Sequence, residues 1–233
     1  AMKRFYKSAE AVPDEGGWSI QLDGRTVRTP SRAPLIVPSG ALAQAIVQEW
    51  ADQGEEIDPR SMPLTGFANA TIDHVLPGLA DFRAQMTAYG ASDLLYYRAD
   101  ETEGLFARQA VAWDPLLDWA SAHYGIVFAV TSGIMPVDQP ELSLVRLAAV
   151  VDALDPWLLA GAATMTQLAG TLIGTLAHLE DRLDADALFD AATIDERWQA
   201  EQWGEDEEAS ALLAARRAEH LGAARYCGLV IAR

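Results

Sequence analysis

Acidic and aromatic side chains gather in one stretch of this chain, between residues 195 and 208. The stretch DERWQAEQWGEDEE holds seven acidic residues, one base and two tryptophans, Trp198 and Trp203. Two carboxyl groups about 5 to 9.5 Å apart beside aromatic platforms would suit glycoside hydrolysis. An exposed acidic surface with aromatic anchors would instead suit the binding of another protein. The sequence supplies residues for both, so both hypotheses stand at this point.

Helix capping accounts for part of the same pattern. Gly204 is placed to end one helix, and Glu205–Glu208 then lie in the first turn of the next, where the helix dipole favours negative charge. Since a capped helix end can also face a partner, this interpretation and a binding surface are compatible. The nearby aspartates Asp184, Asp186 and Asp190 lack the central glycine and terminal glutamate of a calcium loop, so helix capping also explains them better.

Other catalytic groups are sparse. The four histidines, His74, His123, His178 and His220, lie far apart and form no metal-ligand pattern. No nucleophile elbow, phosphate-binding glycine-rich loop or dinucleotide fingerprint occurs. The one cysteine, Cys227, lies in an apolar segment and is expected to be buried and inert. We therefore expect no cofactor, no metal and no enzymatic activity; a hydrolase with an acidic carboxylate cleft is the alternative.

A long uncharged run must help to position these residues. Residues 156–179, between Asp155 and Glu180, carry no charge and would span roughly 36 Å as a helix. A polar stripe and acidic flanks argue against a membrane span, so a central helix covered by other helices is predicted. The polar stripe consists of Thr164, Gln167, Thr171, Thr175 and His178. The glycines expected to allow close packing are Gly161, Gly170 and Gly174.

Composition narrows the class of protein. The chain has 233 residues, half of them hydrophobic, which suits one large domain or two smaller ones with a real core. Its formal net charge of −17 would repel nucleic acid and anionic membranes, and fits a soluble protein. A single cysteine indicates a reducing compartment. With no apolar signal segment or long Arg/Ser-rich presequence near Lys3–Tyr6, a bacterial cytosolic or processed organellar protein is expected.

The first part of the chain has β character. Alternating residues in 18–22 and 25–29 flank Asp23-Gly24, which predicts a β-hairpin over 17–29. A third short strand is expected at 35–37. Ser39 then caps a helix that runs to about residue 53.

The rest of the chain has mainly helical patterns. Pro77-Gly78 is the best boundary, giving an N-terminal α/β domain at 1–77 and a larger helical domain at 78–233. The fold class is thus α+β. A short β-branched run at 126–131 is expected to pair back with the N-terminal sheet. The other helices are predicted at 64–75, 79–89, 103–124 with a kink at Pro115, 141–154, 184–203 and 205–226.

Several short motifs together resemble one family. They occur in the family's order over nearly the whole chain: the hairpin 16–30, Glu49-Trp50, Met62–Thr65, Ala68-Asn69, Asp93–Arg98, Trp113–Pro115, Tyr124-Gly125 and Gln202–Gly204. The chain resembles the F1-ATP synthase assembly chaperones, whose mitochondrial members protect the free α subunit. The absence of a mitochondrial presequence suggests a bacterial member.

The resemblance implies an ATP-independent chaperone that holds the unassembled F1 α subunit until the β subunit replaces it. It implies a monomer in the bacterial cytoplasm, or in the mitochondrial matrix for eukaryotic relatives, with no stable membrane insertion. An adaptor protein of another complex is, like the hydrolase, an alternative to this chaperone function. The residues expected to bind the partner are Glu196, Trp203, Gly204, Glu205 and Asp206, with Trp50 and Glu49 as a second candidate. Trp50 also fits a core position on an apolar helical face.

Overall fold

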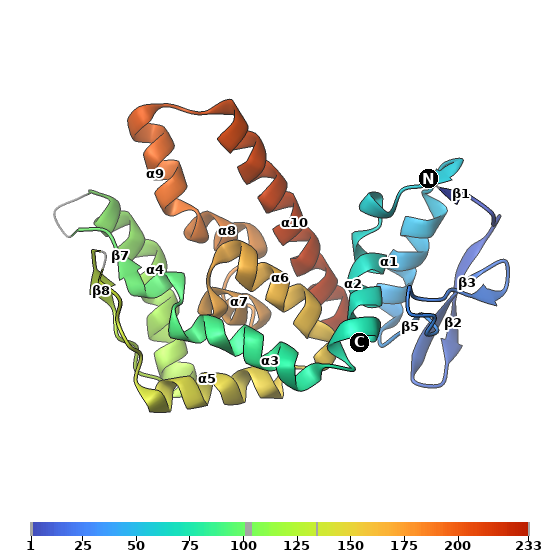
Figure 1. Ribbon diagram of the computed structural model, residues 1–233, viewed down its shortest axis with the longest axis horizontal. Helices are drawn as coiled ribbons and strands as arrows, with labels where there is room; N and C mark the ends of the chain where they lie inside the picture. The colour runs from blue at the N-terminus through green and yellow to red at the C-terminus, as the bar shows by residue number, and fades with distance from the viewer. Residues whose placement is uncertain (1, 101–103, 134, 233) are drawn as a thin grey trace. The chain divides into compact units, whose positions relative to one another are not determined.

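The computed structural model describes residues 2–100, 104–133 and 135–232 of the chain (Figure 1). Its contacts divide into two compact units. Unit 1 is Ala1–Leu79, Asp155–Gly161 and Gly222–Arg233, and unit 2 is Ala80–Leu154 and Ala162–Leu221. The boundaries between the units fall inside three helices, whereas sequence analysis drew one boundary at a single turn.

Unit 1 contains a small antiparallel sheet, as the sequence predicts. Its strands are β2 (Ala9–Asp14), β3 (Gly17–Leu22), β4 (Arg25–Thr26) and β5 (Ile36–Val37). β3 pairs with all of the others. The turn between β3 and β4 is the predicted Asp23-Gly24, and both residues have positive φ, 49° and 74°. Strand β2 pairs with β3 along its whole length and was not singled out by sequence analysis.

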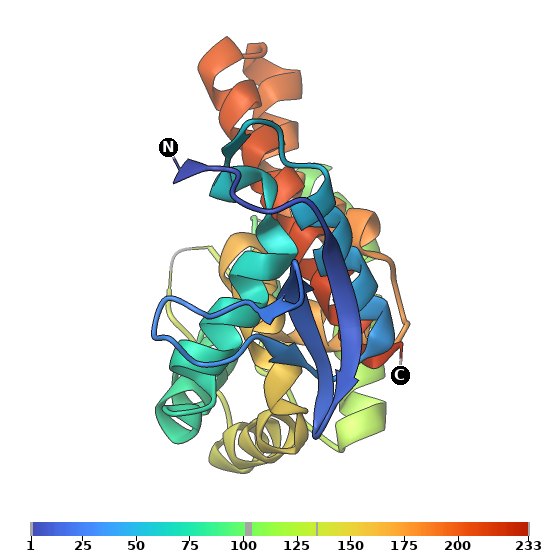
Figure 2. The same cartoon turned by 90° about the vertical axis from the view of Figure 1, so that its right-hand side faces the viewer.

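Helix α1 (Gly40–Ala51) covers one face of this sheet (Figure 2). The predicted cap is present, because Ser39 Oγ accepts the N–H of Leu42 at 3.1 Å. Leu42 and Ile46 are fully buried on the face of α1 that packs in the core. Near the end of the helix, β1 (Met2–Lys3) pairs with β6 (Glu56–Ile57), and a short helix, η1 (Pro59–Ser61), follows.

Segments from the far end of the chain complete the core of unit 1. The Tyr226 hydroxyl lies 3.0 Å from Thr71 Oγ1, and its ring packs on Phe67 with centroids 5.1 Å apart. Ser39 Oγ donates to the carbonyl of Leu229 at 2.6 Å. Sequence analysis assigned these last residues to the helical domain, because a boundary chosen from turn chemistry gives no sign that the chain returns to its first domain.

Unit 2 is mainly helical. It contains η3 (Tyr89–Ala91), η4 (Leu94–Tyr96), β7 (Tyr97–Arg98), α4 (Gly104–Tyr124), β8 (Thr131–Ser132), α5 (Glu141–Ala153), α7 (Leu172–Leu179), α8 (Ala185–Ala192) and α9 (Ile194–Trp203). Three helices have residues in both units: α3 (Leu79–Ala88), α6 (Leu159–Ala169) and α10 (Glu207–Ile231). The remaining elements, α2 (Pro63–Ala70), η2 (Thr71–Val75) and η5 (Pro156–Leu158), belong to unit 1. In unit 2, Trp113 of α4 is fully buried against Ile173 and Ala177 of α7, and its indole N–H donates to the Ala191 carbonyl at 2.8 Å.

The predicted strand at 126–131 is wrong in extent and in partner. Only Thr131–Ser132 forms a strand, and it pairs in parallel with β7 of the same unit. Side chains hold the preceding backbone instead. Ser143 Oγ donates to the carbonyl of Val127 at 2.6 Å, and Gln139 exchanges two hydrogen bonds with the backbone of Ala129. These bonds occupy backbone groups that a sheet would have needed.

The single long helix predicted over 156–179 is also wrong. Gly170, with φ of 70°, ends α6, and Thr171 caps α7 by accepting the Gly174 N–H at 2.9 Å. Thr171 and Thr175, two residues of the predicted polar stripe, are buried. An uncharged composition alone does not reveal the break, because both short helices are apolar and well buried.

Two of the three glycines have the packing role expected of them. A Cβ at Gly161 would lie 2.6 Å from Cys227 Sγ, and one at Gly174 would lie 2.5 Å from Leu188 Cδ1. Gly170 serves the positive φ of the helix break instead. No helix in the described part of the chain is long and apolar enough to cross a membrane.

The buried carboxylate of Asp93 fixes the start of α7. It accepts the N–H groups of Leu95 and Ile173, each at 3.0 Å, while the Leu94 N–H donates to the Gly170 carbonyl. Burial outweighs these hydrogen bonds and raises the pKa of Asp93 to about 6. The folded chain thus binds a proton at this carboxyl more tightly than the unfolded chain does.

We predict that Asp93→Asn lowers the free energy of unfolding at pH 7 by about 1 to 3 kcal/mol, since one buried N–H loses its acceptor. The raised pKa stabilises the folded state fully below about pH 4, and that stabilisation is lost as the pH rises to about 6. The advantage of the wild type over the variant should therefore shrink across this range. Urea unfolding of both proteins at pH 4, 5, 6 and 7 measures it, and a constant difference would contradict the role of Asp93.

Candidate functional site

The acidic and tryptophan-containing stretch forms the hairpin of α9 and α10. Gly204, with φ of 94°, caps α9 and donates its N–H to the Ala200 carbonyl at 2.9 Å. Asp206 then caps α10, accepting the Ala209 N–H at 2.8 Å. The capping that sequence analysis expected is present, although α10 begins at Glu207 and not at Glu205.

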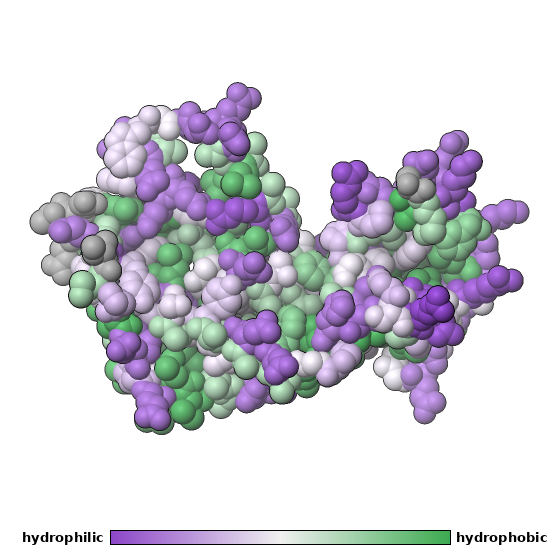
Figure 3. Space-filling model, in the orientation of Figure 1, coloured by the Kyte–Doolittle hydropathy of each residue, from purple (hydrophilic) through white to green (hydrophobic). Residues whose placement is uncertain are grey.

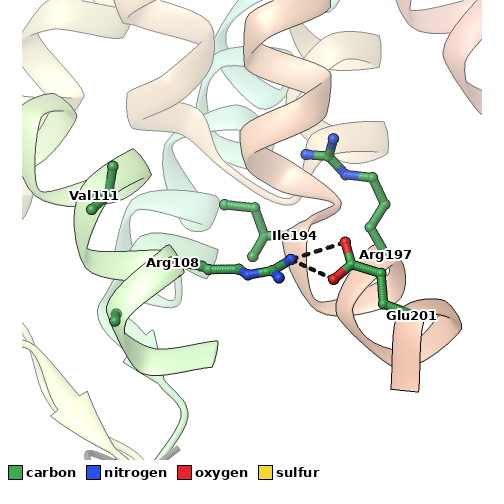
Figure 4. Close-up of a pocket in the computed structure, with 6 residues that line it drawn as sticks. Arg108, Val111, Ile194, Arg197 and Glu201 are labelled. Carbon is green, nitrogen blue, oxygen red and sulfur yellow. Dashed lines mark hydrogen bonds and ion pairs between the residues drawn. The ribbon is translucent and has the colours of Figure 1, made fainter. Parts of the chain in front are cut away.

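Helix α9 is attached to α4 by polar contacts. Gln109 donates to Asp195 at 2.7 Å, and Arg108 pairs with Glu201 at 2.7 Å while its guanidinium lies over the Trp198 ring. Figure 4 shows Arg108 and Glu201 reaching toward one another from the two helices. Beside this pair lies a hollow of about 460 Å³. These contacts hold α9 along its length, although the helix itself has no buried residue.

Two arginines near the middle of α10 attach it to neighbouring helices. Arg216 pairs with Glu196 of α9 at 2.8 Å and donates to the Leu168 carbonyl at 3.0 Å. Arg217 pairs with Asp186 and Asp190 of α8. Of the three aspartates that sequence analysis assigned to helix capping, only Asp184 caps α8, accepting the Ala187 N–H at 2.7 Å, whereas Asp186 and Asp190 pair with Arg217. No group of three potential metal ligands occurs among the described residues.

A groove of about 380 Å³ lies between α9 and α10. Its exposed apolar groups are Trp203, 80% exposed, and Leu212, 64% exposed. Figure 3 shows hydrophobic surface along α10 beside hydrophilic side chains at the end of the hairpin. The remaining lining residues are Glu196, Gln199, Ala200, Gly204, Asp206, Ala209, Ser210, Leu213 and Arg216. A groove with an exposed tryptophan and acidic neighbours has the chemistry of a surface that receives another polypeptide.

The structure brings four of the seven predicted site residues into this groove. They are Glu196, Trp203, Gly204 and Asp206. Glu205 lies between two of them in the chain and is exposed, but does not line the groove. Sequence analysis missed the α10 side, although Ala209, Leu212, Leu213 and Arg216 recur at helical spacing and could have indicated a shared face.

The other two predicted residues, Glu49 and Trp50, belong to unit 1 and are both 8% exposed. The Glu49 carboxylate accepts the N–H groups of Leu64 and Thr65 at 2.7 and 2.8 Å, at the start of α2. The Trp50 carbonyl accepts the hydroxyl of Tyr6 at 2.6 Å. The carboxylate of Glu49 is thus used to cap a helix.

His220 and Cys227 are buried and His178 is partly buried, whereas His74 and His123 are exposed. His178 Nδ1 lies 3.0 Å from the Leu183 carbonyl, as expected of a structural histidine. Burial lowers the pKa of His220 to about 4, so its ring is neutral at pH 7. Cys227 is buried as predicted, and burial raises its pKa to about 12. A thiol held in that state is a poor nucleophile.

Charge is divided unevenly between the units. Unit 2 has 23 Asp or Glu against 8 Lys or Arg, and unit 1 has 11 against 9, which together make the 34 acidic and 17 basic residues of the chain. The groove thus lies in the unit with a net charge of −15, and unit 1 has −2. The negative electrostatic potential that this charge produces favours the binding of basic or neutral partners at the groove.

Comparison with known proteins identifies the family. The model of the family described as "ATP12 chaperone protein" matches residues 3–121, about half of the chain. The crystal structure of Atp12 from Paracoccus denitrificans superposes with a TM-score of 0.95 at 42% identity, covering 100% of this chain and 99% of that one. This chain belongs to the ATP12 chaperone family. The family predicted from the ordered motifs, the ATP synthase assembly chaperones, is therefore confirmed.

Two further proteins are similar to this chain in structure or in sequence. The Atu1473 protein of Agrobacterium tumefaciens matches with a TM-score of 0.91 at 39% identity, covering 97% of this chain and 85% of that one. The mitochondrial protein atp12 of Schizosaccharomyces pombe is 24% identical over 226 residues, which is 90% of this chain and 76% of that protein. The predicted α+β class agrees with these structures.

We predict a large loss of stability for one of the predicted site residues and almost none for another. Glu49→Ala should lower the free energy of unfolding by about 3 kcal/mol, because two buried N–H groups lose a charged acceptor. Trp203→Ala should change it by no more than about 0.5 kcal/mol, because the side chain is largely exposed. Chemical denaturation measures both, with Glu55→Ala as an exposed acidic control in unit 1. Unfolding of the Trp203 variant would show that this residue is structural.

Proposed function

We propose that this chain is an ATP-independent assembly chaperone that binds the unassembled F1 α subunit of ATP synthase until the β subunit replaces it. Membership of the ATP12 family supports the assignment to ATP synthase assembly. The α9–α10 groove is the observation that supports the choice of binding site. In this groove Trp203, 80% exposed, lies beside acidic residues, and α9 has no buried side chain.

The physical reason for such a protein lies in its client. A subunit of an obligate ring exposes a large apolar interface before assembly, and that interface aggregates. A holder must cover the interface and still be displaced by the true neighbour. A modest groove with one aromatic anchor suits weak, reversible binding, while the strong negative charge of unit 2 keeps the complex from precipitating.

The proposal assigns a separate part to each residue. Trp203 is the apolar anchor, and Glu205 supplies an exposed charge next to it. Asp206 and Gly204 fix the turn, and Glu196 keeps α9 attached to α10 through Arg216. We propose that the protein works as a monomer in the bacterial cytoplasm, without cofactor and without catalysis.

The decisive experiment is an aggregation assay. The isolated F1 α subunit is diluted from denaturant with and without an equimolar amount of this protein, in the absence of ATP, and light scattering is followed. We expect scattering to fall, and β subunit added afterwards to release α into αβ assemblies. No suppression, while an unrelated holdase succeeds, would refute the function; capture of a different complex would favour an adaptor.

We predict that Trp203→Ala and Glu205→Lys each raise the protein concentration needed for half-suppression about tenfold, because they remove the anchor and its adjacent charge. Asp118→Lys, which reverses an exposed acid elsewhere in unit 2, is the matched control and should behave as the wild type. If all three variants suppress aggregation equally, the client binds elsewhere, even if the chaperone function stands.

A further inference from the structure

Unit 1 has a hollow of its own, of about 590 Å³, near the end of α1. The β3–β4 hairpin lines one side and the segment before β2 lines the other. Phe5 is 66% exposed there, although it is a large apolar side chain. Its ring meets that of Tyr6 edge-on at 5.4 Å, and Tyr6 meets Trp50 in the same way at 5.6 Å. These three rings form an aromatic wall that runs from the surface into the core.

Two arginines that also line this hollow are available to a ligand. The Arg25 side chain makes no ion pair or hydrogen bond with any described residue, and the Arg28 side chain donates only to the backbone carbonyl of Arg32. The nearby carboxylate of Asp23 is already engaged, because it accepts the N–H groups of Ser8 and Lys7 at 2.9 and 3.0 Å. These bonds hold the pKa of Asp23 below its usual value, so it stays ionised yet leaves the guanidinium groups unpaired.

The third feature is an unused hydrogen-bond donor. Trp50 lines the hollow, and its indole Nε1–H is buried without an acceptor among the described residues. An indole nitrogen can only donate, and most buried donors in proteins have a partner. A ligand that brings a carbonyl or carboxylate oxygen beside the ring would supply the missing acceptor.

Strand β4 would align an extended ligand along the edge of the sheet. It lies at an edge of the sheet, since it pairs with β3 and no other strand of the sheet lies beyond it in the described chain. An open edge receives extended polypeptide, whose backbone supplies carbonyl acceptors along the strand and whose alternate side chains enter neighbouring pockets. The aromatic wall, the two arginines and the edge strand together select for a protein segment.

We propose that this hollow binds an extended segment of a partner protein in which a large apolar side chain is flanked by Asp or Glu. The apolar side chain packs against Phe5, Tyr6 and Trp50, and the flanking carboxylate pairs with Arg25 or Arg28. This preference is opposite to that of the acidic groove in unit 2. The proposal does not depend on the identity of the chaperone's client.

The test uses capped, fluorescein-labelled pentapeptides with Phe, Leu or Ala at the centre and Asp, Glu or Lys on both sides. Fluorescence anisotropy measures their binding to the full chain. We expect the acidic peptides with central Phe or Leu to bind, and the Lys-flanked and Ala-centred peptides to bind at least about fivefold more weakly. If no acidic peptide binds more tightly than its Lys-flanked counterpart, the proposal is overturned.

Variants locate the binding. Arg25→Gln and Trp50→Phe should each weaken the acidic peptides about fivefold, through loss of a charge partner and of one hydrogen bond. Arg225→Gln, at an exposed arginine of unit 1 outside the hollow, should bind as the wild type. In ¹H–¹⁵N spectra the indole cross-peak of Trp50, identified by its absence in Trp50→Phe, should move on addition of the acidic peptide. An unmoved Trp50 peak, or equal binding by all variants, would place the peptide elsewhere.

Discussion

The arrangement of unit 2 depends on the buried carboxylate of Asp93, which forms no ion pair with any described residue. It bonds the N–H groups of Leu95 and Ile173, residues nearly eighty positions apart in the chain. It thereby compensates for the free N–H groups that the break at Gly170 leaves at the start of α7. Because α7 then packs against Trp113, the position of α4 follows from this contact, and α4 in turn carries the polar side chains that hold α9.

Unit 1 relies on the same device. Glu49 receives the first N–H groups of α2, as Asp93 does for α7. In both units an acid remote from the helix in sequence, and not the local cap alone, satisfies the helix start. This use of buried acids means that the strong negative composition of the chain reflects two requirements: some acids hold helices inside, while those around residues 201–208 remain at the surface.

Local signals in the sequence predicted local structure well. The Asp23-Gly24 turn, the Ser39 cap and the Gly204 cap follow from the φ angles and hydrogen-bonding of individual residues, and the structure has all three. The break at Gly170 and the pairing of Thr131 with Tyr97 depend on partners far along the chain, so no pattern within a short window could indicate them. Four groove residues were found because capping and charge cluster in one stretch, whereas the α10 side required knowing which face of that helix is exposed.

The return of the chain's last helix to unit 1 has a consequence for biosynthesis. Tyr226 contributes a fully buried ring to the core of the unit that is translated first. Domains usually fold as they leave the ribosome, beginning with the N-terminal one. Here the first unit lacks part of its interior until translation of the chain is nearly finished. Until then, the newly synthesised sheet and α1 leave apolar side chains of the unit 1 core exposed. This chaperone therefore passes through an aggregation-prone state of its own, like that of the subunits it is proposed to protect.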